Sequence, residues 1–311
     1  MPPAATSVPA SLPSRDSARG PWLVLASAVI WSFGGTFARF LGALDPWTVV
    51  FWRAAWAVAF LAGFMLSRDG PKGMAALFRA MGRPGLVVAF CFALASTSFV
   101  VALGLTSVAN VLLIQAGVPL IAALLAWAAF GERVSGPTWA AIAAVLAGVA
   151  IMVSDGLGGG RGALPGNALA VLIALAFATA TVVTRRHAGV RMVPAVTLGM
   201  LISGAAAGLM LTISPGPGLA VSPGQMALLA GFGGLSLGLG LALFVTGAPL
   251  VPSAVAALLG TAETMLGPFW VWLILGETPG PRTLLGGGVV LGALVAHLLW
   301  QIAARGPRAS G

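Results

Sequence analysis

VPLIAALLAWAAFGE (residues 118–132) and ETMLGPFWVWLILGE (residues 263–277) are the two stretches that decide the fold of this chain. Three identities recur at an offset of 145 residues, pairing Trp127 with Trp272, Gly131 with Gly276 and Glu132 with Glu277. The second half of the chain therefore repeats the first. A duplicated apolar unit is typical of membrane transporters built from internal repeats.

Composition places the chain in lipid. Hydrophobic residues make up 59% of it and charged residues only 7%, and its mean hydropathy is +1.02. Apolar stretches long enough to cross a bilayer begin near Trp22, Trp47, Pro84, Ser107, Pro137, Pro165, Val193, Gly224, Val251 and Arg282. Because backbone polar groups must be satisfied internally in lipid, we expect an all-α membrane protein with ten transmembrane helices.

The ten predicted spans divide into two repeats of five. We expect a disordered cytoplasmic tail over residues 1–20, helices 1–5 over 21–154, helices 6–10 over 165–301, and a second cytoplasmic tail over 302–311. Five is an odd number, so the second repeat enters the membrane from the opposite side. The repeats are therefore inverted, which predicts a substrate site near the midplane between them.

Basic residues give the orientation. With the amino terminus inside, all but four of the 16 Lys and Arg residues fall on the inner side, the exceptions being Arg39, Arg161 and Arg282 outside and Arg53 within a span. Positive residues are retained on the cytoplasmic side. We therefore expect a multi-pass protein of the inner (plasma) membrane with both termini cytoplasmic. In one inner loop, the spacing of Met74, Leu77, Phe78 and Met81 suggests a short surface helix, with an irregular loop as the alternative.

Four segments carry a family resemblance: IWSFGG (30–35), DPWTVVFWRAAWA (45–57), TSVANVLLIQAGVPLIAALLAWAAFGERVS (106–135) and AETMLGPFWVWLILGE (262–277). They resemble the drug/metabolite transporter superfamily, in its ten-helix branch with two EamA domains, and within it the YddG-type aromatic amino-acid exporters. The resemblance implies export of small organic solutes, including amino acids, by alternating access to a central cavity.

Two ionisable groups fall inside predicted spans. Glu263 lies twelve residues into its span, which is about 18 Å deep at 1.5 Å per residue. It is a candidate site for a substrate amine or a proton, or alternatively a structural residue bonding neighbouring helices. Arg53 lies only six residues into its span, so we expect its side chain to snorkel outward in a structural or interfacial role.

Polar and aromatic residues inside the spans complete the candidate cavity. The expected substrate-binding residues are Trp31, Ser32, Thr36, Ser96, Asn110, Gln115, Thr179, Glu263 and Thr264. The Ser and Thr side chains have the alternative of bonding to their own helices, and the aromatic rings that of packing. Asn110 and Gln115, beside a bend at Pro119, are expected to form a hydrogen-bonding corner facing Glu263. Hinges are expected at Pro119, Pro268, Gly234 and Gly238, and Gly288/Gly292 is a further candidate for close helix approach.

No metal or cofactor site is expected, since Cys91 is the single cysteine and no metal or phosphate motif is present. The expected partners are a small solute and membrane lipid rather than nucleic acid, for a monomer or a homodimer. An intramembrane enzyme, the first alternative function, would need paired acids or a nucleophile with a base at one depth. A channel, the second, would need polar rings. A carrier for another metabolite or drug is a third, and proton coupling stays open.

Overall fold

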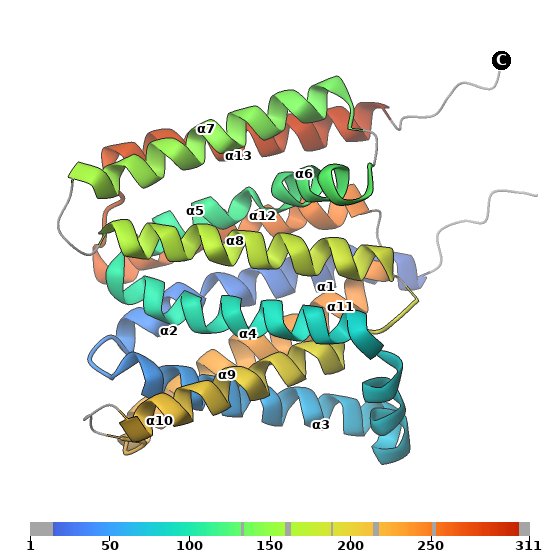
Figure 1. The fold of residues 1–311 in the computed structure, drawn as a ribbon, viewed down its shortest axis with the longest axis vertical. Coiled ribbons are helices and arrows are strands. Elements are labelled where there is room, and N and C mark those ends of the chain that lie inside the picture. The colour runs from blue at the N-terminus through green and yellow to red at the C-terminus, as the bar shows by residue number, and fades with distance from the viewer. Residues whose placement is uncertain are drawn as a thin grey trace, which may run out of the picture.

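The computed structural model describes residues 15–131, 134–158, 163–187, 189–213, 218–250 and 253–304. Within these ranges every regular element is a helix, and the long helices run roughly along one common direction (Figure 1). In chain order they are α1 (Arg15–Ser32), α2 (Gly34–Phe40), α3 (Pro46–Ala80), α4 (Gly82–Leu105), α5 (Val108–Ala116), α6 (Val118–Phe130), α7 (Gly136–Gly158), α8 (Ala163–Arg186), α9 (Val193–Ile213), α10 (Pro223–Ala230), the π-helix η1 (Gly231–Leu239), α11 (Gly240–Gly247), the short 3₁₀ helix η2 (Ala248–Leu250), α12 (Ser253–Leu275) and α13 (Pro281–Ala304). The predicted all-α fold is confirmed. Of the expected tails over 1–20 and 302–311, residues 1–14 and 305–311 lie outside the described residues, whereas residues 15–20 and 302–304 are helical and belong to α1 and α13.

The described helices follow the ten predicted spans in order. Among the described residues, seven helical segments are long and apolar enough to cross a membrane, and the bent pair Val108–Ala116 and Val118–Phe130 makes an eighth if it is counted as one span. The other two expected spans correspond to the shorter apolar helices Gly136–Met152 and Ala262–Leu275. The chain is therefore a multi-pass membrane protein, with seven or eight crossings by length and composition.

Local signals in the sequence explain where α3 begins and bends. The Asp45 carboxylate accepts hydrogen bonds from the backbone N–H groups of Trp47 and Thr48, at 2.9 and 3.3 Å, and so caps the helix. At Gly70 the backbone adopts φ 70°, which kinks the chain before a last helical segment ending at Ala80. This segment is the predicted short helix, and its Leu77 packs against the core.

The two halves of the chain interleave rather than forming separate lobes. The most extensive helix contacts join elements of α1–α7 to elements of α8–α13, as in α4 with α8, α7 with α13, α3 with α9 and α1 with α12. When each helix is replaced by its counterpart in the other half, every one of these contacts becomes a contact that the structure also has. Thus α1 with α12 corresponds to α8 with α5 and α6, and α3 with η1 corresponds to α9 with α4. This pattern is the one that a pseudo-two-fold axis requires.

Two left-handed glycines mark the axis most clearly. Gly131, after α6, has φ 64°, and Gly276, after α12, has φ 69°. Each N–H donates to the carbonyl of the aligned tryptophan, Trp127 or Trp272, at 2.8 and 2.9 Å. We call the end of the bundle where α1 begins and α13 finishes the termini end, and the other the distal end. In Figure 1, α6 finishes at the termini end and α12 at the distal end, so the related helices point in opposite directions.

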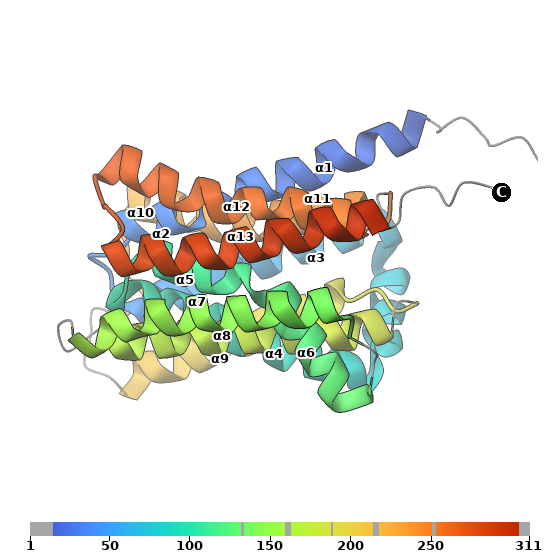
Figure 2. The ribbon, with the colours of Figure 1, turned by 90° about the horizontal axis from the view of Figure 1, so that it is seen from above.

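Close backbone contact occurs between α7 and α13, which lie side by side in both views (Figures 1 and 2). A Cβ atom added to Gly148 would come within 2.6 Å of the Gly286 carbonyl oxygen, and one added to Gly286 within 2.5 Å of the Gly148 oxygen. The expectation of close approach at Gly288/Gly292 is wrong, because a Cβ at either meets no described atom within 4 Å. On α13 the glycine that permits close approach is Gly286, which lies on a different face of the helix from Gly288 and Gly292.

Candidate functional site

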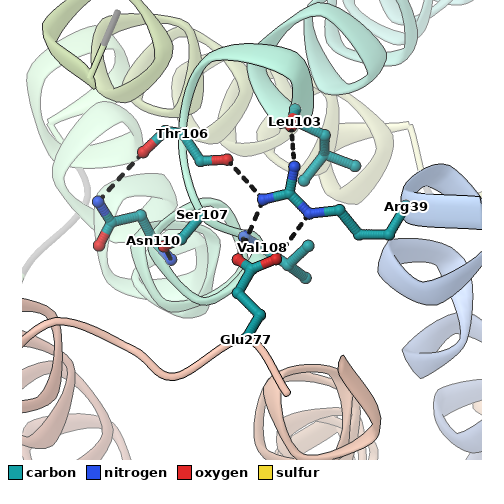
Figure 3. Close-up of polar contacts among 7 residues, drawn as sticks. All are labelled: Arg39, Leu103, Thr106, Ser107, Val108, Asn110 and Glu277. Carbon is teal, nitrogen blue, oxygen red and sulfur yellow. Dashed lines mark hydrogen bonds and ion pairs between the residues drawn. The ribbon is translucent and has the colours of Figure 1, made fainter. Parts of the chain in front are cut away.

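An ion pair joins the two repeats at the distal end of the bundle. The Arg39 Nε lies 2.7 Å from Glu277 Oε2, and Arg39 Nη2 donates to Glu277 Oε1 at 3.0 Å. The same guanidinium donates to the carbonyl oxygens of Leu103 (2.7 Å) and Thr106 (3.1 Å), and Glu277 Oε1 accepts from the Val108 N–H at 3.2 Å (Figure 3). These contacts tie α2, the α4–α5 turn and the end of α12 together. We call this group of residues the distal cluster.

Asn110 extends the distal cluster toward the second repeat. Its Nδ2 donates to Asn167 Oδ1 at 3.0 Å and to Thr106 Oγ1 at 3.2 Å, and its Oδ1 accepts from Thr283 Oγ1 at 2.5 Å. Asn110 is 5% exposed and Asn167 fully buried. The structure therefore places Asn110 in a polar contact between α5, α8 and α13. In the described residues no hydrogen bond joins Asn110 or Gln115 to Glu263, the residue that the predicted corner was expected to face.

Glu263 lies on the face of α12 that packs against the first repeat. Gly267, one turn further along, faces Leu112 of α5 and the Ser32 carbonyl of α1, and residues four apart on a helix share a face. The opposite face, including Met265 and Trp272, is at least half exposed to the lipid region. Glu263 itself is half-buried, and it belongs to neither ion pair of the described residues. It is therefore a carboxylate directed toward the interface between the repeats.

Ser32 and Trp270 connect α1 to this same face of α12. Ser32 is buried, and its hydroxyl donates to the Val29 carbonyl at 2.6 Å and accepts from Trp270 Nε1 at 3.0 Å. The Trp270 indole stacks on the Phe33 ring, with centroids 5.0 Å apart and planes 13° apart. The structure thus brings the predicted Ser32 to the interface that Glu263 also faces.

The other predicted polar residues are distributed over several helices. Gln115 donates to the Val111 carbonyl (3.2 Å) and Thr179 to the Leu175 carbonyl (2.8 Å), which are bonds within their own helices. Thr264 is 9% exposed, on the buried side of α12. The Trp31 Nε1 and the Thr36 Oγ1 are buried, and neither has a hydrogen-bond partner in the described part of the chain.

Arg53 corrects a sequence expectation. It is only 7% exposed and does not snorkel to an interface. Its Nη1 donates to the hydroxyl and carbonyl oxygens of Ser96, at 2.7 and 3.4 Å, and its guanidinium carbon lies 4.4 Å from the centroid of the Phe232 ring. Depth counted along the sequence failed because helix packing, not the number of residues from the span end, decides exposure. The predicted residue Ser96 is thus the partner of a buried cation.

The predicted hinge positions differ in their surroundings. The fourth crossing bends by 44° between α5 and α6, at Gly117, with Pro119 in the first turn of α6. Pro268 lies inside α12. Gly234 and Gly238 both belong to the π-helix η1. A Cβ at Gly238 would collide with the Phe60 ring, whereas one at Gly234 would meet no described atom within 4 Å.

Sequence reasoning missed the Arg39–Glu277 pair, although part of its signal was present. Glu277 closes the repeated segment and both residues were expected at the outer side. Their 238-residue separation gave no reason to pair them. Glu132, which is related to Glu277 by the repeat, lies outside the described residues.

Comparison with known proteins agrees with this architecture. The family model described as the EamA-like transporter family matches residues 18–154 and again residues 164–299. A solved crystal structure shares the fold at a TM-score of 0.65 and 18% sequence identity, over 94% of this chain and 100% of that chain. A search of curated proteins finds no match. The two family matches cover nearly all of the helical region and coincide with the two interleaved repeats, and the chain therefore belongs to the EamA-like transporter family.

Proposed function

We propose that this protein is a secondary transporter that exports small organic solutes, foremost amino acids with aromatic or other apolar side chains, across the inner membrane. Membership of a transporter family supports a small-molecule solute and a lipid environment. The amino-acid substrate and the alternating-access mechanism are the parts that we add. Residues 21–154 and 165–301 serve as the two inverted repeats of this mechanism.

The observation that carries the proposal is Glu263. It is a carboxylate well inside a membrane-crossing helix, on the face that meets α1 and α5 of the other repeat. A charge at this depth costs about 2.5–3.5 kcal/mol on insertion scales, so such a group is a functional candidate by default. A carboxylate binds an ammonium group or a proton. Trp270, two turns further along α12, stacks on Phe33, and this aromatic pair suits an apolar amino acid.

The two ends of the bundle support alternating access. At the distal end, Arg39, Glu277 and the α4–α5 turn are bonded together. At the termini end, where α6 and α8 finish, a cavity of about 110 Å³ is lined by Ala126, Phe130, Val182, Arg185 and Arg186. By the pseudo-two-fold axis these are related places, since α8 corresponds to α1 and α6 to α12. Among the described residues the first is joined by an ion pair and the second holds this cavity, which fits a carrier closed at the distal end, while Glu132, the counterpart of Glu277, lies outside the described residues.

The orientation follows from the same picture. α8 finishes at the termini end, and its last turn carries Arg185 and Arg186. α3, which carries Arg68 and Asp69, runs toward the same end, and Asp69 pairs with Arg191 at an Nη1–Oδ1 distance of 2.6 Å. α2, whose last turn carries Arg39, finishes at the distal end. We infer from the positive-inside rule that the termini end is cytoplasmic. The closed distal end then faces outward, and the cavity faces the source of an exported solute.

Transport in proteoliposomes tests the proposal. The purified full chain is reconstituted, and counterflow of radiolabelled amino acids is compared between wild type, Glu263→Gln and the control Asp45→Asn. The control makes the same carboxylate-to-amide change at a helix cap, where Asn caps as well as Asp. We expect Glu263→Gln to lose about tenfold or more of the rate, the worth of one charge-assisted contact, with folded yield and the control unaffected. Wild-type kinetics in Glu263→Gln would remove this residue from the site.

A further inference from the structure

Arg53 is a buried cation that the proposed function has not yet used. Its side chain is 7% exposed within the bundle, and its hydrogen bonds to described residues all go to Ser96. The guanidinium lies between two rings, with centroids at 4.4 Å for Phe232 and 5.5 Å for Phe99. In the described part of the chain its Nε has no hydrogen-bond partner.

No carboxylate of the described residues balances this charge. The ion pairs there are Arg39 with Glu277 and Arg191 with Asp69, and neither includes Arg53. A neutral hydroxyl, a carbonyl and two ring faces solvate a guanidinium only in part, so a buried arginine ordinarily has an anionic partner. An arginine held ready with a free N–H therefore indicates an anion that arrives from outside the chain. The planar guanidinium fork matches a carboxylate in geometry.

The helix next to Arg53 is unusual in a way that fits a ligand site. Phe232 and Gly233 belong to η1, a nine-residue π-helix, and π-helical segments are frequent at functional sites. A Cβ at Gly233 would collide with the Arg53 carbonyl, so only glycine permits this close approach of η1 to α3. Where η1 passes into α11, Gly240 faces the indole of Trp31, whose Nε1 is also without a described partner. Two N–H donors without a described partner, Arg53 Nε and Trp31 Nε1, therefore lie beside η1 and its junction with α11.

We propose that Arg53 binds the carboxylate of the transported solute. This inference rests on the proposed function and narrows its substrate class to carboxylate-bearing solutes. The Arg53 guanidinium binds the carboxylate near the start of η1. The negative charge of the carboxylate neutralises the positive charge of Arg53, which no carboxylate of the described residues balances. Glu263 has the opposite charge, and its helix α12 and the π-helix η1 both pack against α1. An amino acid carries one group complementary to each of these two charges.

The test compares an acid with its matched amide. Counterflow into proteoliposomes is measured for a radiolabelled amino acid, for example phenylalanine, and for its carboxamide, which keeps the side chain and the ammonium group but not the carboxylate. The proteins are wild type, Arg53→Gln, Arg53→Lys and the control Arg79→Gln, which removes an exposed arginine from the end of the same helix. We expect wild type and control to prefer the acid by about tenfold or more, as one charge-assisted bidentate contact predicts. Arg53→Gln should lose this preference, and Arg53→Lys should keep part of it.

Each outcome decides between the two proposals. An unchanged acid-to-amide ratio in Arg53→Gln, or an equal fall for both solutes, overturns the role of Arg53, because a purely structural role lowers both rates together. If Arg53→Gln does not fold, the wild type decides, and equal transport of acid and amide by the wild type overturns the inference.

A panel of carboxylates without an amine is run in parallel. Should wild type transport these but no amino acid, with loss in Arg53→Lys, the amino-acid proposal fails while the carboxylate site stands. If neither panel is transported, both fail.

Discussion

Arg39 and Glu277 lie 238 residues apart in sequence and form an ion pair, with Arg39 Nε 2.7 Å from Glu277 Oε2. The side chains are 28% and 27% exposed, so the pair is partly shielded from water. Because Arg39 also holds the carbonyls of Leu103 and Thr106, the pair closes three elements of the distal end around one guanidinium. This contact is the one that must open if the distal end admits or releases solute.

Locking that contact should stop transport. In a background with Cys91 replaced by Ala, the double variant Arg39→Cys/Glu277→Cys, joined by a bifunctional thiol reagent whose reducible spacer takes the place of the two long side chains, should lose counterflow, and cleavage of the spacer should restore it. The single cysteine variants, treated with the same reagent, serve as controls. Full transport by the crosslinked protein would show that the distal end does not open during the cycle.

The strength of the same pair can be measured by a double-mutant cycle. Arg39→Gln, Glu277→Gln and the double variant are compared by thermal unfolding in detergent. We expect a coupling free energy of about 1 kcal/mol, at the upper end for partly exposed pairs, because the pair is reinforced by backbone hydrogen bonds. Strictly additive effects would mean that the two side chains stabilise the protein independently.

Asn110 should prove structural rather than substrate-binding. Replacing it with Ala removes three hydrogen bonds, to Asn167, Thr106 and Thr283. Thr106 and Asn167 keep their mutual hydrogen bond of 2.7 Å, but the buried Thr283 hydroxyl loses its described partner, which costs about 1–3 kcal/mol. We expect a lower unfolding midpoint with unchanged solute preference. A shifted preference at normal stability would return Asn110 to the solute site.

Glycines at the α7–α13 contact should be intolerant of a methyl group. Gly286→Ala brings a Cβ within 2.5 Å of the Gly148 carbonyl oxygen, and neither backbone can yield easily. Overpacking of this kind costs about 1–3 kcal/mol, so the unfolding midpoint should fall. Gly288→Ala, on the same helix with open space around its Cβ, should be neutral or stabilising by about 0.5–1 kcal/mol. Equal effects of the two substitutions would contradict the packing described for α7 and α13.

The repeat predicted the fold because two similar segments with five spans each must enter the membrane from opposite sides. Gly131 and Gly276 occupy matching left-handed positions after helices that end at opposite sides, as five spans per repeat require. The order of the apolar helices could likewise be read from hydropathy. The helices α7 and α12 are 23 residues long each, in keeping with the apolar stretches that predicted them.

The site was less predictable because it depends on which helix faces are turned toward each other. Asn110 was predicted to line a cavity, but a partner on α8 and another on α13 bind it at the distal end. Arg53 was judged by its distance from the end of its span, whereas packing of η1 against α3 buries it. Neither contact has a signal within a single helix.

Trans-stimulation tests the central claim, that this protein is a carrier, most directly. Proteoliposomes containing the purified full chain are preloaded with unlabelled amino acid, and uptake of the labelled form is followed with and without the preload. The account predicts saturable uptake that accelerates with preload, because one site is exposed to each side in turn. Uptake that rises linearly with concentration, is indifferent to preload and accompanies single-channel currents would contradict it.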